Sequence, residues 1–247
     1  MGRHGRIYFL DEARGLSILL MVLHHAAYDA AFLQIFPLGF LGADWFGAIR
    51  AFFAGVFVLI SGAACRLSRS NLRRGAKCLL LAAGLWAITG WLFPAQPIRF
   101  GVLHLLGCAM LLFACLRPLL DRIPPSFSAV AGCTLFFVGF GVPAGRVGFG
   151  PVGMALPAFL YRDAFTAAFG FPGPGYFSAD YFPLIPWLFL FWAGTGLGVW
   201  LRLGRGPRWL YRSHSLFLAA AGRRSLWIYL VHQPVLYLFF LVLCRWV

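Results

Sequence analysis

Residues 16–32 read LSILLMVLHHAAYDAAF, a near-continuous apolar run. A helix that crosses the hydrocarbon core of a bilayer needs roughly 20 such residues. Similar apolar runs recur along the chain. The third and fourth runs are short, so the predicted start of each of these two helices extends a few residues earlier. The predicted spans are Leu16–Phe32, Ile49–Cys65, Cys78–Phe93, Val102–Leu116, Phe127–Val142, Leu184–Leu201 and Leu226–Cys244.

Composition points to the same class of protein. Hydrophobic residues make up 61% of the chain, charged residues 11%, and the mean hydropathy is +0.81. Soluble domains average about 45–50% apolar and about 25% charged residues, so lipid has to cover much of this surface. Backbone groups in lipid must be satisfied within the segment, which favours helices. We therefore predict an all-α, polytopic membrane helix bundle of about seven transmembrane helices, with residues 1–247 as a single domain.

The net charge of +14 does not indicate a nucleic-acid partner, because the basic residues gather in alternate loops between the spans. This is the positive-inside pattern. It predicts a protein of the inner (plasma) membrane with a cytoplasmic N-terminus and an outer C-terminus. Arginines at a bilayer surface also contact anionic headgroups, so membrane lipids are expected partners. The predicted cytoplasmic set is Arg3, Arg6, Arg14, Arg66, Arg69, Arg73, Arg74, Lys77, Arg117, Arg122, Arg202, Arg205, Arg208, Arg212, Arg223 and Arg224.

The six cysteines contain no CxxC pair and no spacing typical of metal ligands. Most of them fall within predicted spans, where a free cysteine acts as a small apolar packing residue. We expect no metal. The cysteines are Cys65, Cys78, Cys108, Cys115, Cys133 and Cys244.

The long outer segment Pro143–Pro183 is rich in glycine, proline and aromatic residues. Loops of this length are often functional. Within it, Ala155–Phe169 is a candidate interfacial helix that either caps an outward cavity or lies on the membrane surface. Asp180 in this segment is a candidate substrate-binding residue, as is His104 near the outer end of the fourth span, where an exposed interfacial role is the alternative.

The first span carries the densest set of ionisable residues, which are costly in lipid and mark candidate functional sites. His25 follows Arg14 by eleven residues, so it lies about 16 Å deeper at helical rise. Asp29 lies one turn after His25 on the same face. A carboxylate beside an imidazole holds its tautomer and raises its basicity, as a general base requires. The alternative is a structural pair that joins two helices. His24 points about 100° away and is secondary.

The last span supplies a second candidate cluster. His232 lies about ten ångströms above the start of this span at helical rise. Pro234 has no N–H to bond with the carbonyl of Leu230, so a kink there would open space beside His232. We take His232 as a catalytic candidate and Gln233 as a substrate-binding candidate. The alternative is a proline kink with one packed polar residue.

Five sequence blocks, in order along nearly the whole chain, carry a resemblance to a known family. They resemble bacterial relatives of heparan-α-glucosaminide N-acetyltransferase. The spacing from Arg14 to His25 also resembles the wider transmembrane acyltransferase group, in which a basic residue precedes a histidine with ten residues between them. The blocks are residues 10–29, 57–62, 100–107, 180–187 and 222–235.

This resemblance implies acyl transfer across a membrane. Cytoplasmic acetyl-CoA would donate an acetyl group to an amine or hydroxyl of a glycan or lipid-linked sugar on the other side. His25 would be the base or acyl acceptor, Asp29 its orienting partner and Arg14 a contact of CoA. Arg223 and Arg224 at the start of the last span are further CoA candidates, since guanidinium groups bind phosphates as bidentate donors.

Two rival functions remain open from the sequence. One is an O-acyltransferase of the wider acyltransferase-3 type. The other is a non-catalytic, proton-coupled carrier that uses His25 and Asp29 as a proton relay. The sequence gives neither the acceptor nor the acyl chain length. It also leaves open whether the chain forms a homo-oligomer.

Overall fold

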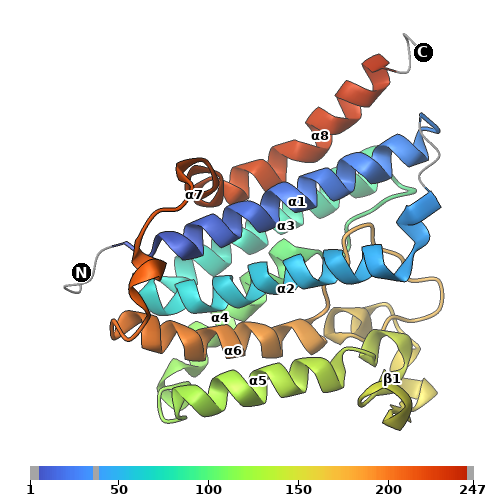
Figure 1. Cartoon of the computed structure of the whole chain (residues 1–247). Helices are drawn as coiled ribbons and strands as arrows, with labels where there is room; N and C mark the ends of the chain where they lie inside the picture. The colour runs from blue at the N-terminus through green and yellow to red at the C-terminus, as the bar shows by residue number, and fades with distance from the viewer. Residues whose placement is uncertain (1–5, 36–38, 244–247) are drawn as a thin grey trace. The chain divides into compact units, whose positions relative to one another are not determined.

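The structure is a computed structural model that describes residues 6–35 and 39–243, so Arg3, Cys244 and Arg245 lie outside the described residues. Seven of the described helices are long and apolar enough to cross a membrane (Figure 1). The α-helices are α1 (Tyr8–Phe32), α2 (Asp44–Leu67), α3 (Asn71–Leu92), α4 (Val102–Leu120), α5 (Pro125–Gly139), α6 (Leu184–Arg202), α7 (Leu216–Arg223) and α8 (Ser225–Leu243).

Each predicted span falls on one long helix, so the prediction of an all-α, polytopic membrane bundle is confirmed. Helices α1, α2 and α3 begin well before the predicted spans, and α5 and α8 begin slightly before them. Helix α3 starts at Asn71 because the Ser70 hydroxyl accepts a hydrogen bond from the N–H of Arg73 and caps the helix there. Helix α1 starts at Tyr8, and its polar first turns belong to the helix rather than to the preceding loop.

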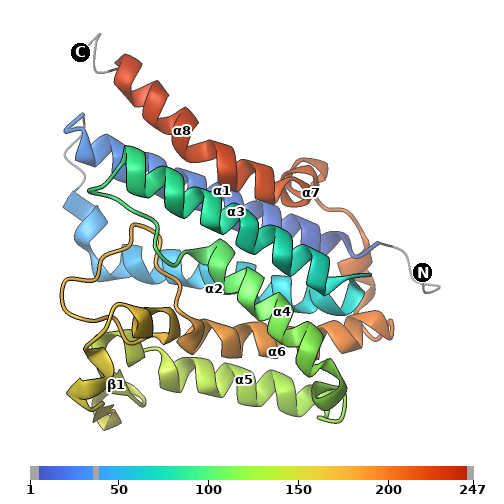
Figure 2. The ribbon, with the colours of Figure 1, turned by 180° about the vertical axis from the view of Figure 1, so that it is seen from behind.

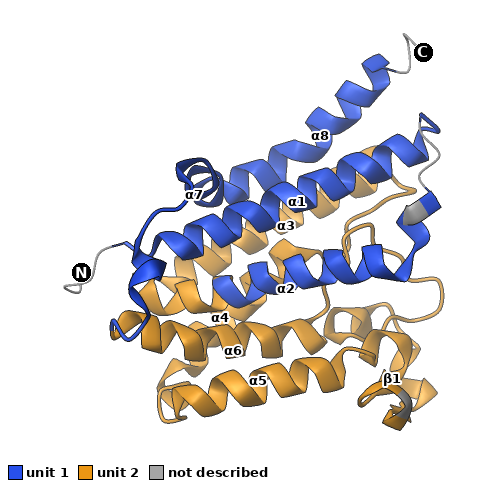
Figure 3. Cartoon of the chain, in the orientation of Figure 1, with its two compact units in different colours: residues 1–60, 204–247 blue, residues 61–203 orange. Residues whose placement is uncertain are grey.

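The chain divides into two compact units, which Figure 3 shows in different colours. Unit 1 comprises residues 1–60 and 204–247, and unit 2 comprises residues 61–203. Helix α2 passes from the first unit into the second. The single domain predicted over residues 1–247 stays a prediction.

In unit 1, α8 runs alongside α1 in the same direction (Figures 1 and 2), and the short helix α7 packs against α1. Glycines permit the close approach of α1 and α7. A Cβ atom on Gly15 would lie 2.0 Å from the carbonyl oxygen of Leu218, and one on Gly222 would lie 1.8 Å from that of Asp11. Small residues at such contacts let helix backbones pack closely in membranes. This contact sets the register of α1 against α7 and α8.

In unit 2, α5 lies beside α6, and α3 lies beside α4 (Figures 1 and 2). Glycines again mark the closest contacts. A Cβ atom on Gly132 of α5 would lie 2.7 Å from the carbonyl oxygen of Phe189 in α6. A Cβ atom on Gly62, in the last part of α2, would lie 2.1 Å from that of Phe191. Helix α6 therefore packs closely against both α5 and the end of α2.

The connection from α5 to α6 consists of short elements. The expectation of one helix over Ala155–Phe169 is wrong, because Pro157 and Gly170 bound two separate 3-10 helices. The hydroxyl of Tyr181 donates to the carbonyl of Ala167 at 2.7 Å and holds the second of them in place. The strands β1 (Arg146–Val147) and β2 (Met154–Ala155) pair antiparallel, with Arg146 opposite Ala155. The 3-10 helices are η1 (Gly39–Gly42), η2 (Val142–Ala144), η3 (Gly150–Val152), η4 (Ala158–Tyr161), η5 (Phe165–Phe169) and η6 (Arg208–Tyr211).

Candidate functional site

Unit 1 brings together polar residues from the middle of α1 and α8. We call His24, His25, Asp29, His232 and Gln233 the histidine cluster. The ring centroids of His25 and His232 are 5.1 Å apart, and those of His24 and His25 are 5.7 Å apart. The parallel course of α1 and α8 therefore places two histidines that are far apart in sequence in direct contact.

Asp29 binds Gln233 rather than the histidine that the sequence suggested. Both carboxylate oxygens of Asp29 lie 3.0 Å from Nε2 of Gln233, which donates to them. Among the described residues, no hydrogen bond joins Asp29 to His25. The carboxylate of Asp29 instead faces α8 at the level of Gln233. Asp29 and Gln233 thus hold α1 to α8 beside the two histidines.

The contacts of His232 fix which of its ring nitrogens carries the proton. Nδ1 lies 2.6 Å from the carbonyl oxygen of Tyr229. A carbonyl oxygen only accepts hydrogen bonds, so Nδ1 must carry the hydrogen and Nε2 must carry the lone pair of the neutral ring. Helix α8 continues through Pro234 to Leu243. His232 therefore presents a basic nitrogen inside a spanning helix.

The three arginines expected to bind the donor lie at one level of unit 1. Arg14 is next to Gly15, and Arg223 is next to Gly222, and a Cβ atom on Gly15 would lie 3.0 Å from the backbone nitrogen of Gly222. Arg223 and Arg224 are exposed where α7 gives way to α8. Arg14 forms an ion pair with Asp11 at 3.8 Å. The backbone positions of these arginines are therefore close together. They lie about 16 Å along α1 from His25 at helical rise.

Glu12 has a role that sequence reasoning missed. Its buried carboxylate accepts hydrogen bonds from the backbone nitrogens of His214 and Ser215, at 2.7 and 2.9 Å, and from the Ser213 hydroxyl at 3.1 Å. These donors precede α7, which Ser215 caps. Glu12 therefore fixes the start of α7 on α1. The signal available in the sequence was that Glu12 is one of only seven acidic residues in an apolar chain.

In unit 2, the other two substrate-binding candidates meet at the N-terminus of α4. Asp180 Oδ2 accepts a hydrogen bond from the backbone nitrogen of Val102 at 3.0 Å. Nδ1 of His104 lies 3.2 Å from the backbone nitrogen of Gly101. An amide N–H only donates, so Nδ1 of a neutral His104 carries the lone pair and Nε2 carries the hydrogen. His104 is thus a donor through Nε2, the opposite of His232.

Aromatic side chains surround this end of α4. The ring of Phe100 stacks on His104 with centroids 5.3 Å apart. The guanidinium carbon of Arg99 lies 5.6 Å from the ring centroid of Tyr176, which in turn packs against Tyr181. Burial raises the pKa of the hydroxyls of Tyr176 and Tyr181, so both are neutral near pH 7, and Tyr181 uses its hydrogen on Ala167. Aromatic faces beside a carboxylate and a histidine N–H suit a polar, ring-shaped ligand.

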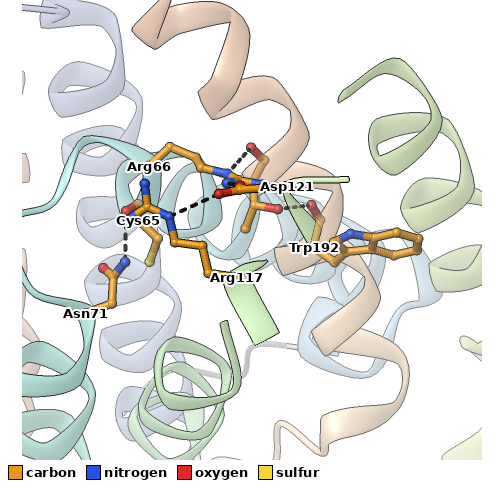
Figure 4. A network of polar contacts seen from close by, with 7 residues as sticks. Cys65, Arg66, Asn71, Arg117, Asp121 and Trp192 are labelled. Carbon is orange, nitrogen blue, oxygen red and sulfur yellow. Dashed lines mark hydrogen bonds and ion pairs between the residues drawn. The ribbon is translucent and has the colours of Figure 1, made fainter. Parts of the chain in front are cut away.

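A second site that sequence reasoning missed lies at the other end of unit 2 (Figure 4). Arg66 is buried and binds Asp121, and its Nε donates to the carbonyl oxygen of Thr195 at 3.3 Å. Arg117 reaches the same carboxylate at 3.4 Å. Burial raises the pKa of Asp121, but the two arginines outweigh it and leave the pKa below its usual value. The signal was Asp121, another of the seven acidic residues, one helical turn after Arg117.

Comparison with known proteins identifies one family. The sequence profile described as "Heparan-alpha-glucosaminide N-acetyltransferase, catalytic" matches residues 6–234. This match contains the histidine cluster as well as His104 and Asp180. No curated protein and no solved structure matches the chain.

Proposed function

The chain is an integral membrane protein that belongs to the heparan-α-glucosaminide N-acetyltransferase family, and on this premise we propose that it is an acyl-CoA-dependent acyltransferase. It moves an acetyl group from cytoplasmic acetyl-CoA to an amine or hydroxyl of a glycan or lipid-linked sugar on the far side of the membrane. The N-terminus lies in the cytoplasm. The observation that carries the proposal is the pair of contacting histidines inside two spanning helices of a chain from this family.

The histidine cluster supplies the base for this reaction. As the acceptor nitrogen or oxygen attacks the thioester carbonyl, the histidine pair takes its proton. The C–S bond breaks, and the CoA thiolate leaves and regains a proton. His232 Nε2 has the lone pair that this step needs, and His25 lies against it. Asp29 and Gln233 act as positioning residues, because their hydrogen bonds fix α1 against α8.

The donor enters at the arginines of unit 1. CoA carries several phosphate charges and stays at the aqueous face of the membrane. Arg14, Arg223 and Arg224 provide guanidinium groups at one level of unit 1, and the charge pattern of the loops assigns that level to the cytoplasm. An extended pantetheine arm is roughly as long as the distance of about 16 Å from there to His25.

The acceptor binds through the polar and aromatic groups around the start of α4. His104 offers the N–H of Nε2 to an acceptor oxygen, and Phe100 stacks behind its ring. Asp180 caps α4 and holds this end of the helix in place. These groups favour a sugar-like acceptor over a purely apolar one.

The decisive experiment is acetyl transfer in proteoliposomes. Purified protein with labelled acetyl-CoA outside the vesicles and amine or hydroxyl sugars inside should consume the thioester and label the sugar. Labelling of hydroxyl acceptors alone would favour the acyltransferase-3 type of O-acyltransferase. Proton flux without thioester consumption would favour the carrier and contradict the proposal.

A further inference from the structure

A cavity of about 330 Å³ lies at one end of unit 2, and none of its lining residues has been assigned a role in the proposed reaction. We call it the Arg66–Arg202 cavity. It is formed where α2, α4 and α6 end and α5 begins. Each of these ends borders a basic loop, so the cavity opens where a charged group from water or from a lipid headgroup is within reach. Its polar lining comes from Arg66, Asp121, Ser128 and Arg202.

Ser128 has a hydroxyl that nothing in the described structure uses. The residue is only 3% exposed, yet it lines the cavity. Among the described residues, no hydrogen bond to its hydroxyl is formed. The hydroxyl is therefore able to donate a hydrogen bond to a ligand in the cavity.

The start of α5, where Pro125 and Ser128 line the cavity, adds positive potential. This helix begins with Pro125 after Pro124 and has no side-chain cap. The backbone N–H of Ser128 binds the carbonyl of Pro124, whereas those of Ser126 and Phe127 have no partner within the helix. A helix N-terminus also carries partial positive charge, which favours an anion.

The charges around the cavity leave a positive excess. Asp121 is the one acidic side chain in its lining, and it already pairs with Arg66 and with Arg117. Arg202 lines the cavity from the end of α6 and forms no ion pair with any described residue. Arg66 uses one nitrogen on Asp121 and another on Thr195, which leaves donors of its planar group.

We propose that the Arg66–Arg202 cavity binds a phosphate group through Arg202 and the Ser128 hydroxyl, next to the positive end of α5. Arg66 is the buried cation behind this site, and Asp121 holds it in position. The bound phosphate belongs either to a nucleotide such as CoA or to the headgroup of an anionic lipid. The nucleotide and the lipid headgroup would be recognised by the same chemistry, because both present phosphate oxygens at the ends of the spans.

The test compares variants of the whole purified protein. Arg202→Gln and Ser128→Ala remove donors without burying a new charge, whereas Arg66 variants risk failure to fold. Arg69→Gln is the matched control, since Arg69 is an exposed arginine of the same unit that does not line the cavity. One arm measures calorimetric binding of CoA and of pantetheine, which lacks the nucleotide phosphates. The other measures phosphatidylglycerol retained over phosphatidylcholine by native mass spectrometry.

Loss of one charge-assisted contact should weaken phosphate binding about tenfold in Arg202→Gln, with a smaller loss in Ser128→Ala. A loss confined to CoA identifies a nucleotide phosphate, and a loss confined to phosphatidylglycerol identifies a headgroup; either supports the site. Unchanged binding of both, or an equal loss in Arg69→Gln, overturns it. A wild-type protein that binds no CoA would contradict the proposed function, while the lipid arm would still decide the fate of the cavity.

Discussion

The histidine cluster of unit 1 and the Arg66–Asp121 pair of unit 2 both place polar side chains in a very apolar chain. In the cluster, imidazole rings lie against each other, and the one carboxylate accepts from a neutral amide. In unit 2, a buried guanidinium is matched by an opposite charge, a backbone carbonyl and the face of Phe113 at 4.8 Å. The first region lies within the spanning helices α1 and α8, whereas the second lies at the ends of α2 and α4.

This difference separates reactive groups from fixed ones. An imidazole can take up and release a proton, and the neutral ring of His232 keeps a lone pair on Nε2. A guanidinium does not lose its proton in a protein, so Arg66 can bind or support but not act as an acid or base. Substitutions in unit 1 should therefore affect turnover first, and substitutions in unit 2 should affect stability and binding first.

The largest expected effect is on catalysis by the histidine pair. His25→Ala and His232→Ala should each lower acetyl transfer about 10²–10⁴-fold, because the base is lost while the fold stays intact. His24→Ala is the matched control, since its ring packs on Phe46 and should matter much less. Initial rates in proteoliposomes, with folding checked by size exclusion, measure this. Full activity in both folded variants would remove the proposed base.

The next effect concerns the contact that sets the register of the cluster. Gly222→Ala would place a Cβ atom 1.8 Å from the carbonyl oxygen of Asp11, so α7 and α8 must move away from α1. We expect a loss of about 3 kcal/mol, the upper range for overpacking, together with reduced activity.

Gly84→Ala in α3 is the control for this change, because a Cβ atom there meets nothing within 4 Å. Alanine is a better helix former than glycine, so this variant should unfold no more easily than wild type. Thermal unfolding in detergent measures both. Equal stability of the two variants would contradict the close contact of α1 with α7.

Sequence reasoning predicted the spans well and the contacts within the site only in part. Long apolar runs fix where helices cross lipid, which is why seven helices match. The pairing of His25 with His232 depends on the register that Gly15 and Gly222 impose, and no local pattern encodes it. For the same reason, helical spacing suggested His25 as the partner of Asp29, whereas the actual partner, Gln233, lies on another helix.

A smaller effect is expected at the ion pair of unit 2. Asp121→Asn would leave the buried guanidinium of Arg66 without its opposite charge. Removing one partner of a fully buried pair costs about 3–5 kcal/mol, but Asp121 is 46% exposed, so we expect about 1–2 kcal/mol. Arg117→Gln, which removes an exposed pair within one helix, should cost about 0.5 kcal/mol or less. Equal losses in chemical unfolding would contradict the central role of Arg66.

The smallest effect is the pH dependence of the same pair. Its two arginines hold the pKa of Asp121 below the ordinary value of 3.8, so the folded protein keeps this carboxylate charged at a pH where the unfolded chain has begun to protonate it. The stability that Asp121 contributes is therefore complete well above pH 3.8 and declines as the pH falls below it. Other carboxylates titrate in the same range, so the difference between wild type and Asp121→Asn is the quantity to follow. That difference in free energy of unfolding should stay constant from pH 7 to about pH 5 and shrink toward pH 3. A difference that grows on acidification would mean that the protonated form of Asp121 is the one that the folded protein prefers.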